Sequence, residues 1–267
     1  LSEEWGQFFH KNNFLIGLSL DGTIHTHDAY RRTASGKETF KDIMNTAHMF
    51  EKNLVEFNIL TVVNKKTANA VEKIYKFYKK NNFKYLQFIP CLDPYEDQGG
   101  QMSFSLTPDK YGQFLCELFD LWYADLMSGD GVSIRQFDNY LAMLKGYPPE
   151  SCDMIGQCGI QHVIESDGSV YPCDFYVLDL YKLGNVYQDS LEDMQRKRGE
   201  LRFVEESVIT KEECKACPYY YLCRGGCKRH RMMAGSDGFQ DNYFCSSYKM
   251  FFAYATERMI QISKAMR

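Results

Sequence analysis

The sequence predicts an α/β fold that is followed by a cysteine-rich region. Residues 1–92 alternate between near-continuous apolar segments and amphipathic helical patterns, which is typical of βαβ units around a buried parallel sheet. Eight of the ten cysteines lie at or beyond residue 152. These two observations predict a parallel sheet first and a cysteine-dependent structure after it.

The elements predicted for residues 1–92 follow one another regularly. A helix over 2–11, with Ser2 as its N-cap, precedes an apolar strand over 14–20 that ends at Asp21-Gly22. The next elements are a helix over 36–53, a strand over 55–63, a helix over 66–81 and a strand over 84–90. Three strands are too few to close a barrel. We therefore expect an exposed sheet edge, and a chain that is a fragment lacking upstream strands.

The rest of the chain is predicted to combine helices with one hairpin. A polar loop over 93–106 precedes a helical region over 107–145 with an apolar core stripe. The segment 161–173 is predicted to form a β-hairpin, because Asp167-Gly168 is a strong turn signal. A long helix over 246–266 is expected to end the chain.

Composition excludes several classes of function. The net charge is −4 and the pI is about 5.9, so no electrostatic footprint for nucleic acid is present. The sequence contains no run of 18 apolar residues, the length needed to span a bilayer. A thiol-rich chain without a signal peptide predicts a cytoplasmic location.

The cysteine spacing carries the chemistry. Cys214 to Cys227 form the run C-x2-C-x5-C-x3-C, three cysteines precede it (Cys152, Cys158, Cys173) and Cys245 follows it. Eight thiolates are what two [4Fe–4S] clusters need. Disulfides are disfavoured because a chain of this length buries a core without them, and structural zinc is disfavoured because a second C-x2-C is missing. Cys91 and Cys116 are isolated and are predicted to be core thiols.

The full cysteine pattern resembles the SPASM domain of radical S-adenosylmethionine enzymes. The segments Asp-Gly-Ser-Val-Tyr-Pro-Cys173-Asp174-Phe-Tyr, Leu-Gly-Asn-Val186 and Ser19-Leu-Asp-Gly22 with His27-Asp28-x-x-Arg31 are similar to anaerobic sulfatase-maturating enzymes. The resemblance covers essentially the whole chain. It implies the C-terminal part of a radical S-adenosylmethionine partial (β/α)6 barrel over 1–106, a helical connection over 107–150, and a SPASM domain over 151–267.

The resemblance also implies how the clusters share the cysteines. Cys152, Cys158, Cys173 and Cys227 would hold the auxiliary cluster nearer the active site, and Cys214, Cys217, Cys223 and Cys245 the outer one. A Gly-Gly pair between Cys223 and Cys227 would let the chain turn sharply between the two. Five basic residues interleave with the ligands and either offset cluster charge or form a solvated surface: Lys215, Arg224, Lys228, Arg229 and Arg231.

The implied reaction converts a Cys or Ser side chain of a sulfatase to Cα-formylglycine. A deoxyadenosyl radical removes a Cβ hydrogen, a base takes the thiol or hydroxyl proton, and one electron leaves to an auxiliary cluster. Asp174 matches the position of the family's base. Proton transfer from an ordinary thiol to an ordinary Asp is roughly 6 kcal/mol uphill. We therefore expect burial to raise the pKa of the base, and the substrate radical to acidify the thiol.

Cofactor contacts follow from the same resemblance. Ser19 and Arg31 match positions that meet the methionine end of S-adenosylmethionine, and Leu92 a position near its adenine. The family's C-x3-C-x2-C motif, which holds a third [4Fe–4S] cluster in the full-length protein, is absent from these residues, so the chain alone is expected to be inactive.

The implied partners are a sulfatase polypeptide with a Cys/Ser-x-Pro-x-Arg motif and an electron donor such as ferredoxin or flavodoxin; neither nucleic acid nor membrane is expected, and the protein is expected to be a monomer. Two alternatives stay open at this point. One is another SPASM enzyme that makes a thioether or carbon–carbon crosslink in a peptide. The other is an electron-transfer or zinc-binding module.

Overall fold

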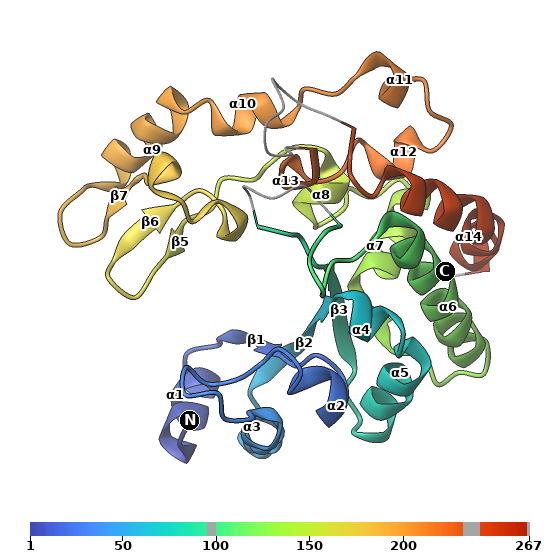
Figure 1. The fold of residues 1–267 in the computed structure, drawn as a ribbon, viewed down its shortest axis with the longest axis horizontal. Coiled ribbons are helices and arrows are strands. Elements are labelled where there is room, and N and C mark those ends of the chain that lie inside the picture. The colour runs from blue at the N-terminus through green and yellow to red at the C-terminus, as the bar shows by residue number, and fades with distance from the viewer. Residues whose placement is uncertain (95–99, 232–240, 266–267) are drawn as a thin grey trace. The chain divides into compact units, whose positions relative to one another are not determined.

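A computed structural model describes residues 1–94, 100–231 and 241–265, and the chain divides into two compact units (Figure 1). Unit 1 comprises Leu1–Lys145 and Ser246–Arg267, and unit 2 comprises Gly146–Cys245. The division into 1–106, 107–150 and 151–267 stays a prediction. The predicted loop over 93–106 includes residues 95–99, and the predicted helix over 246–266 includes residue 266. These residues lie outside the described part of the chain.

Unit 1 contains a parallel sheet with the strand order β1-β2-β3-β4. Its strands are β1 (Leu15–Ser19), β2 (Glu56–Val63), β3 (Tyr85–Pro90) and β4 (Ser133–Ile134). The three predicted strands are confirmed, but their number is wrong because β4 also pairs with β3. Only two residues of β4 join the ladder, too few for a periodic pattern to reveal. β1 has one neighbour, β2, among the described strands.

Helices surround this sheet in unit 1. They are α1 (Glu3–Lys11), α2 (Ile24–His27), α3 (Phe40–Lys52), α4 (Lys65–Ala68), α5 (Val71–Lys80), α6 (Pro108–Met127), α7 (Arg135–Leu144) and α14 (Cys245–Ala265), whose first residue belongs to unit 2. The predicted helix over 66–81 is two helices, because a capping box between Asn64 and Thr67 starts α4 and Asn69 closes it with a bond to the Lys65 carbonyl. Ser2 occupies the N-cap position of α1, but its hydroxyl donates to Glu4 rather than accepting from the helix.

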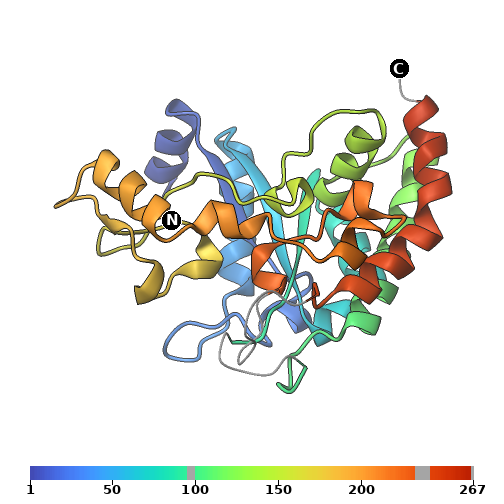
Figure 2. The same ribbon diagram turned by 90° about the horizontal axis from the view of Figure 1, so that it is seen from above.

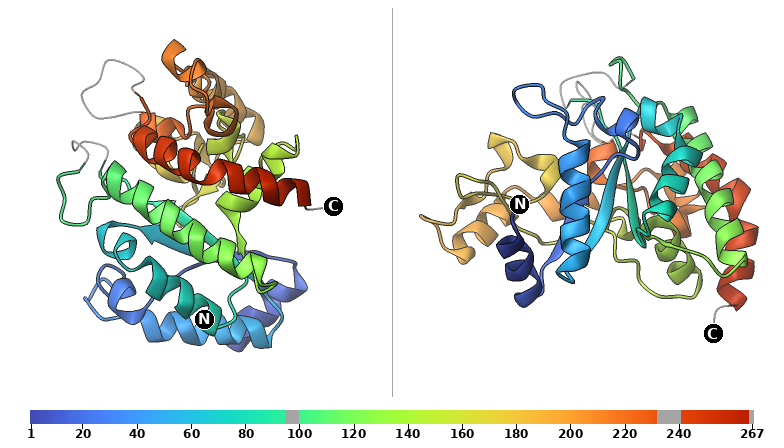
Figure 3. Two further views of the ribbon diagram at one scale, coloured as in Figure 1. Left: turned by 90° about the vertical axis from the view of Figure 1, so that its right-hand side faces the viewer. Right: turned by 90° about the horizontal axis from the view of Figure 1, so that it is seen from below.

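Aromatic side chains form the core where α6, α7 and α14 meet. The ring of Phe137 lies 5.4 Å from that of Phe119, 5.1 Å from that of Trp122 and 5.7 Å from that of Phe251, between ring centroids. The indole Nε1 of Trp122 donates to the carbonyl of Val132. Accordingly, α14 lies beside α6 (Figure 2; Figure 3). The predicted stripe on α6 is therefore core, as expected.

Unit 2 is built from short elements. Its antiparallel sheet has the order β5-β6-β7, with β5 (Val163–Ile164), β6 (Ser169–Tyr171) and β7 (Gly184–Asn185). The predicted hairpin is confirmed, with Gly168 at φ 81° in its turn, and β7 adds a strand that we did not predict. Two 3-10 turns, η1 (Asp174–Tyr176) and η2 (Asp179–Tyr181), connect β6 to β7.

The remaining helices of unit 2 carry three of its eight cysteines, Cys152, Cys214 and Cys223. These helices are α8 (Cys152–Ile155), α9 (Leu191–Glu200), α10 (Phe203–Ser207), α11 (Glu212–Lys215), α12 (Tyr220–Cys223) and α13 (Lys228–Arg231). None of the helices in the described part of the chain combines the length and apolar character needed to cross a membrane. The predicted α/β class, with a parallel sheet and a separate antiparallel hairpin, is confirmed.

Candidate functional site

All ten cysteines lie within the described residues and are free thiols. The eight with the SPASM-like spacing are all in unit 2, whereas Cys91 and Cys116 are in unit 1. The disulfide alternative is therefore not what the structure shows. Cys91 and Cys116 are half-buried, and burial raises the pKa of each thiol to about 11.

Four thiols lie near one another in what we call the first cysteine group: Cys152, Cys158, Cys173 and Cys227. Burial, and then the Asp153 carboxylate and the neighbouring thiols of Cys152 and Cys158, raise the pKa of Cys227 to about 12. Burial also raises the pKa of Cys173, with a smaller contribution from Cys227. Cys158 and Cys173 pack into an aromatic cluster formed by Tyr176, Tyr181 and Phe203. The first cysteine group thus lies against an apolar environment.

The other four thiols form what we call the second cysteine group: Cys214, Cys217, Cys223 and Cys245. Burial, and then the thiols of Cys214, Cys245 and Cys217, raise the pKa of Cys223 to about 12. Cys214 lies in α11 and Cys217 just after it, and the Cys217 N–H donates to the Cys214 carbonyl. A cavity of about 140 Å³ adjoins Cys214 and is also lined by Thr210, Lys211 and Arg231.

A sharp turn sends Cys223 and Cys227 to different groups. Three successive residues between them have left-handed backbone, with φ 48° at Arg224, 84° at Gly225 and 71° at Gly226. A Cβ on Gly226 would lie 2.2 Å from the side-chain nitrogen of Asn242, so only glycine fits there. The sharp turn predicted at the Gly-Gly pair is therefore present.

The donor sets fit two iron–sulfur cubes. Each group offers four thiols, the number of ligands that one cube takes. Within residues 1–94, 100–231 and 241–265, no three His, Cys, Asp or Glu side chains converge closely enough to hold a single ion. A cube holds its thiolates at its corners, farther apart than the ligands of one ion. The raised pKa values mean that the thiols stay protonated at neutral pH until a metal displaces their protons.

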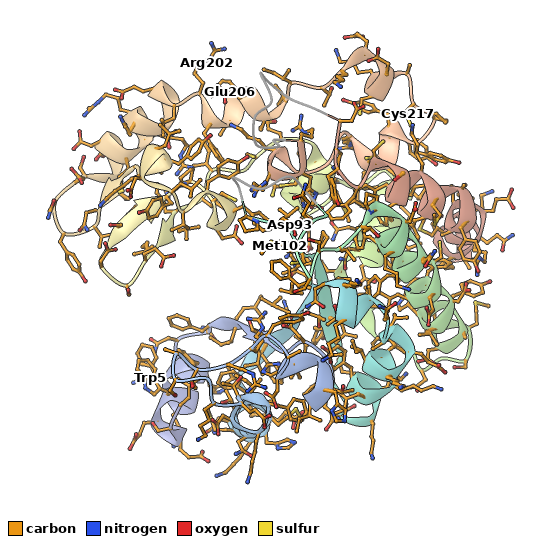
Figure 4. The ribbon with its side chains drawn as sticks, viewed as in Figure 1. Trp5, Asp93, Met102, Arg202, Glu206 and Cys217 are labelled. Atoms are coloured by element: carbon orange, nitrogen blue, oxygen red, sulfur yellow. The ribbon has the colours of Figure 1, made fainter. Side chains whose placement is uncertain are left out.

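Two of the five basic residues that interleave with the ligands are buried. Lys228 is 1% exposed and Arg231 is 2% exposed, whereas Lys215 is exposed. The Lys228 ammonium pairs with Glu206 at 3.0 Å and lies 4.5 Å from the centre of the Phe203 ring (Glu206 is labelled in Figure 4). The solvated-surface interpretation is therefore wrong for these two side chains.

Asp174 lies at the start of η1, directly after the ligand candidate Cys173. The Cys173 thiol donates to its Oδ1 at 3.2 Å. Its side chain is exposed, in contrast to the burial that we expected. In this turn Tyr176 takes the buried position in the aromatic cluster, and Asp174, two residues earlier, faces outward.

The predicted cofactor contacts lie at the carboxyl ends of the strands of unit 1. Ser19 is the last residue of β1, and Leu92 follows β3 beside Asp93, which is labelled in Figure 4. Arg31 donates from Nε and Nη2 to Asp21 at 2.7 and 3.4 Å, and Asp21 also accepts from the Val62 N–H. Asp21, at the end of the predicted strand, is not among the cofactor contacts that the resemblance implied. The signal available in the sequence is an Asp directly after an apolar strand, with an arginine ten residues later.

His27 forms hydrogen bonds at the same strand end. Its Nδ1 accepts from the Asp21 N–H, so Nε2 carries the proton and donates to the hydroxyl of Thr39. That hydroxyl donates to the Arg31 carbonyl. The His27 imidazole therefore reaches Arg31 through Thr39, and the His27 carbonyl accepts directly from the Arg31 N–H at 2.9 Å. Burial lowers the pKa of the imidazole.

Comparison with known proteins identifies the family. Residues 152–218 match the SPASM model, described as an iron–sulfur cluster-binding domain. A "Cysteine-type anaerobic sulfatase-maturating enzyme" of Clostridium novyi is 46% identical over 266 residues, which are 100% of this chain and 71% of that relative. A "Serine-type anaerobic sulfatase-maturating enzyme" of Bacteroides thetaiotaomicron is 33% identical over 286 residues, 100% of this chain and 68% of that relative. The solved structure "Native anSMEcpe with bound AdoMet and Cp18Cys peptide" superposes with a TM-score of 0.94 at 43% identity, over 100% of this chain and 74% of that one. This chain belongs to the family of anaerobic sulfatase-maturating enzymes, which are radical S-adenosylmethionine enzymes with an iron–sulfur SPASM domain.

Proposed function

We propose that this chain takes part in the oxidation of a sulfatase cysteine side chain to Cα-formylglycine. The observation that carries the proposal is similarity over the whole chain to cysteine-type sulfatase-maturating enzymes, together with eight cysteines in two groups of four. The serine-type relative is less similar, 33% against 46%, which supports Cys over Ser as the substrate side chain.

The two cysteine groups are proposed to hold one auxiliary [4Fe–4S] cluster each. Cys152, Cys158, Cys173 and Cys227 would bind the first, and Cys214, Cys217, Cys223 and Cys245 the second. Thiols within each group lie close enough to raise the pKa of Cys223 or Cys227, which supports this assignment. When bound, such clusters supply an acceptor for the electron that leaves the substrate.

Ser19, Arg31 and Leu92 are proposed to contact S-adenosylmethionine. All three lie at or beyond the carboxyl ends of parallel strands, where α/β folds bind their ligands. The ion pair with Asp21 holds the Arg31 guanidinium at the end of β1, which would orient it toward a carboxylate.

Asp174 is proposed as the base that takes the substrate proton. It directly follows Cys173, so a rigid ligand would hold it close to the electron acceptor. Because the side chain is exposed, the proposal relies on the substrate radical to acidify the thiol. Asp174 also accepts a hydrogen bond from Cys173, a partner that cluster binding would deprotonate.

The test is Asp174→Asn in the complete enzyme, because asparagine keeps the size of the side chain but cannot take a proton. We expect deoxyadenosine to form while formylglycine falls by about 10²–10⁴ in rate, the usual cost of losing a general base. Mass spectrometry of a peptide with the Cys-x-Pro-x-Arg motif, run beside deoxyadenosine release, measures both. Asp179→Asn, at an exposed position of η2, is the matched control. Aldehyde formation at the wild-type rate by Asp174→Asn would remove Asp174 from the mechanism.

The proposal also covers the activity of these residues alone, their partners, their location and their oligomeric state. The 267 residues contain no C-x3-C-x2-C motif, so a polypeptide of these residues alone should release no deoxyadenosine from S-adenosylmethionine. The proposed partners are a sulfatase with the Cys/Ser-x-Pro-x-Arg motif and a ferredoxin or flavodoxin. The proposed setting is the cytoplasm, and the proposed state a monomer. Deoxyadenosine release by the purified 267-residue chain would contradict the first of these statements.

A further inference from the structure

Tyr78 contacts the turn that follows β1 in unit 1. This tyrosine belongs to α5 and is fully buried, with 0% exposure. Its hydroxyl donates to the carbonyl of Leu20 at 2.6 Å and accepts from the N–H of Gly22 at 2.8 Å. One side-chain oxygen therefore binds the residue before Asp21 and the residue after it.

The same turn packs directly on α5. Gly22 has a left-handed backbone, with φ 84°, and a Cβ at this position would lie 2.5 Å from Cγ1 of Ile74. Ile74 and Tyr78 are four residues apart in α5, so they lie on one face of the helix. This face therefore holds the turn by close packing as well as by hydrogen bonds.

Thr61 of β2 belongs to the same buried network. Its hydroxyl lies 2.6 Å from that of Tyr78 and 3.0 Å from the carbonyl oxygen of Leu20. Thr61 is also buried, and hydrogen bonds in such surroundings are stronger than in water. Burial raises the pKa of Tyr78, which keeps its phenol protonated and able to donate.

The turn connects Tyr78 to the residues proposed to contact S-adenosylmethionine. Ser19 directly precedes Leu20, and Arg31 pairs with the buried carboxylate of Asp21 at 2.7 Å. Within the described residues, Nη1 of Arg31 has no hydrogen-bond partner, and the side chain is 32% exposed. The guanidinium can therefore bind a carboxylate while Asp21 holds it in place.

We propose that Tyr78 is a positioning residue for S-adenosylmethionine, because it holds the turn in the conformation that presents Ser19 and Arg31. The inference rests on the proposed contacts of these two residues. Tyr78 acts through the turn, since its own side chain is buried away from any ligand. Without its hydroxyl the turn adopts the binding-competent conformation less often, and the Kd rises by the reciprocal of the remaining fraction.

The test is Tyr78→Phe in the complete enzyme with its clusters reconstituted. Phenylalanine keeps the ring in the core and removes the hydrogen bonds to the turn. We expect the Kd for S-adenosylmethionine, measured by equilibrium dialysis without peptide, to rise about tenfold, as when the competent turn is populated about one tenth of the time. Deoxyadenosine release at saturating S-adenosylmethionine should stay within about twofold of the wild-type rate, because the loss concerns binding.

Tyr75→Phe is the matched control. Tyr75 is also a buried residue of α5, but its hydroxyl donates to Asp125 at 2.9 Å rather than to the turn. A general loss of stability would affect both variants alike, whereas we expect Tyr75→Phe to keep the wild-type Kd. A wild-type Kd for Tyr78→Phe, or an equal rise in both variants, would overturn the positioning role.

A double-mutant cycle with Arg31→Gln separates this inference from the proposed contact. Arg31→Gln should raise the Kd by itself, and an unchanged value would reject the contact together with the route that the inference needs. A rise for Arg31→Gln without one for Tyr78→Phe would reject the positioning role alone. The two effects should be less than additive in free energy, because Tyr78 acts partly through Arg31. Full additivity would contradict that route.

Thr61→Val provides a second variant if Tyr78→Phe does not fold. Valine has nearly the shape of threonine, and the change removes the other hydroxyl that contacts the Leu20 carbonyl. Its Kd for S-adenosylmethionine should also rise, by less than that of Tyr78→Phe, because Gly22 keeps its bond to Tyr78. A folded Thr61→Val protein with the wild-type Kd would show that this network does not position the turn.

Discussion

The two units of the chain reach their folds by different means. Unit 1 has long elements, including helices of 20 and 21 residues and a strand of 8, around a shared aromatic core. Among the described residues of unit 2 the longest helix has 10 residues and the longest strand 3. Short elements bury little apolar surface, and unit 2 contains eight thiols and three buried cations, Arg198, Lys228 and Arg231, beside its small aromatic cluster. Unit 1 can therefore be stable through packing alone, whereas unit 2 should depend on bound metal.

Removing the iron is the strongest test of this difference. A chelator under oxidising conditions should abolish protection from hydrogen exchange across 146–245, while the amides of β2 and β3 keep theirs. The reason is that cluster binding supplies folding free energy to the residues that ligate the metal. Exchange followed by mass spectrometry measures both units in one sample. Full protection of unit 2 without iron would show that its small core suffices.

A core truncation should affect unit 1 in the way that metal loss affects unit 2. Phe137→Ala is expected to lower the free energy of unfolding of unit 1 by about 3–5 kcal/mol, because it leaves a cavity among Phe119, Trp122 and Phe251. Both tryptophans lie in unit 1, so their fluorescence in a denaturant titration reports on this unit.

Two controls accompany Phe137→Ala. Tyr85→Ala removes a ring that is 59% exposed and should change the free energy of unfolding by less than about 0.5 kcal/mol. Iron content should stay at the wild-type value in both variants. Loss of iron from Phe137→Ala would show that the two units do not fold separately.

Lys228, one of the buried cations of unit 2, provides a smaller effect. Glu206→Gln leaves the Lys228 ammonium buried without its carboxylate, and we expect a loss of about 1–3 kcal/mol, less than for a fully buried pair because Glu206 is partly exposed. The double variant with Lys228→Met should recover part of the loss, since the charge is then absent as well. Hydrogen exchange of α10 in iron-loaded protein measures both. A double variant less stable than Glu206→Gln alone would indicate that Lys228 stabilises unit 2 through its contact with Phe203 instead.

The same difference explains what the sequence could predict. β2 and α1 follow clear periodic patterns, and the structure has them within one residue of the predicted bounds. β4 and β7 each have two residues, so neither produces a pattern. The break between α4 and α5 depends on the side chain of Asn64, which accepts from two backbone N–H groups, and a search for apolar periodicity ignores such bonds.

The candidate site was predictable to the extent that spacing encodes chemistry. The spacing of the cysteines indicated two clusters, but their assignment to two groups came from the family resemblance, because spacing alone allows several. The ion pair between Asp21 and Arg31 depends on where a strand ends and how the next loop returns. Lys228 and Arg231 could not be told apart from Arg224 by sequence, since all three lie within one basic run and only the fold decides which are buried.

The smallest expected effect comes from a helix cap. It tests whether side chains of unit 1 stabilise that unit without bound metal. Asp28 is 6% exposed, and its Oδ1 accepts from the N–H groups of Thr39 and Phe40 at 3.0 and 2.9 Å, where α3 begins. The N-cap residue Thr39 makes no such bond with its own side chain. Asp28→Ala should therefore lower the free energy of unfolding by about 1 kcal/mol, the usual cost of a lost cap.

Asp28→Asn keeps an acceptor and should lose less. The matched control is Asp42→Ala, which removes an exposed acid from the first turn of the same helix. It should lower the free energy of unfolding by only about 0.3 kcal/mol. Tryptophan fluorescence in denaturant measures all three variants. Equal losses for Asp28→Ala and Asp42→Ala would mean that charge near the helix start, rather than the two hydrogen bonds, stabilises α3. Iron content should not change in any of them, because α3 is secured by side chains of unit 1, without help from metal.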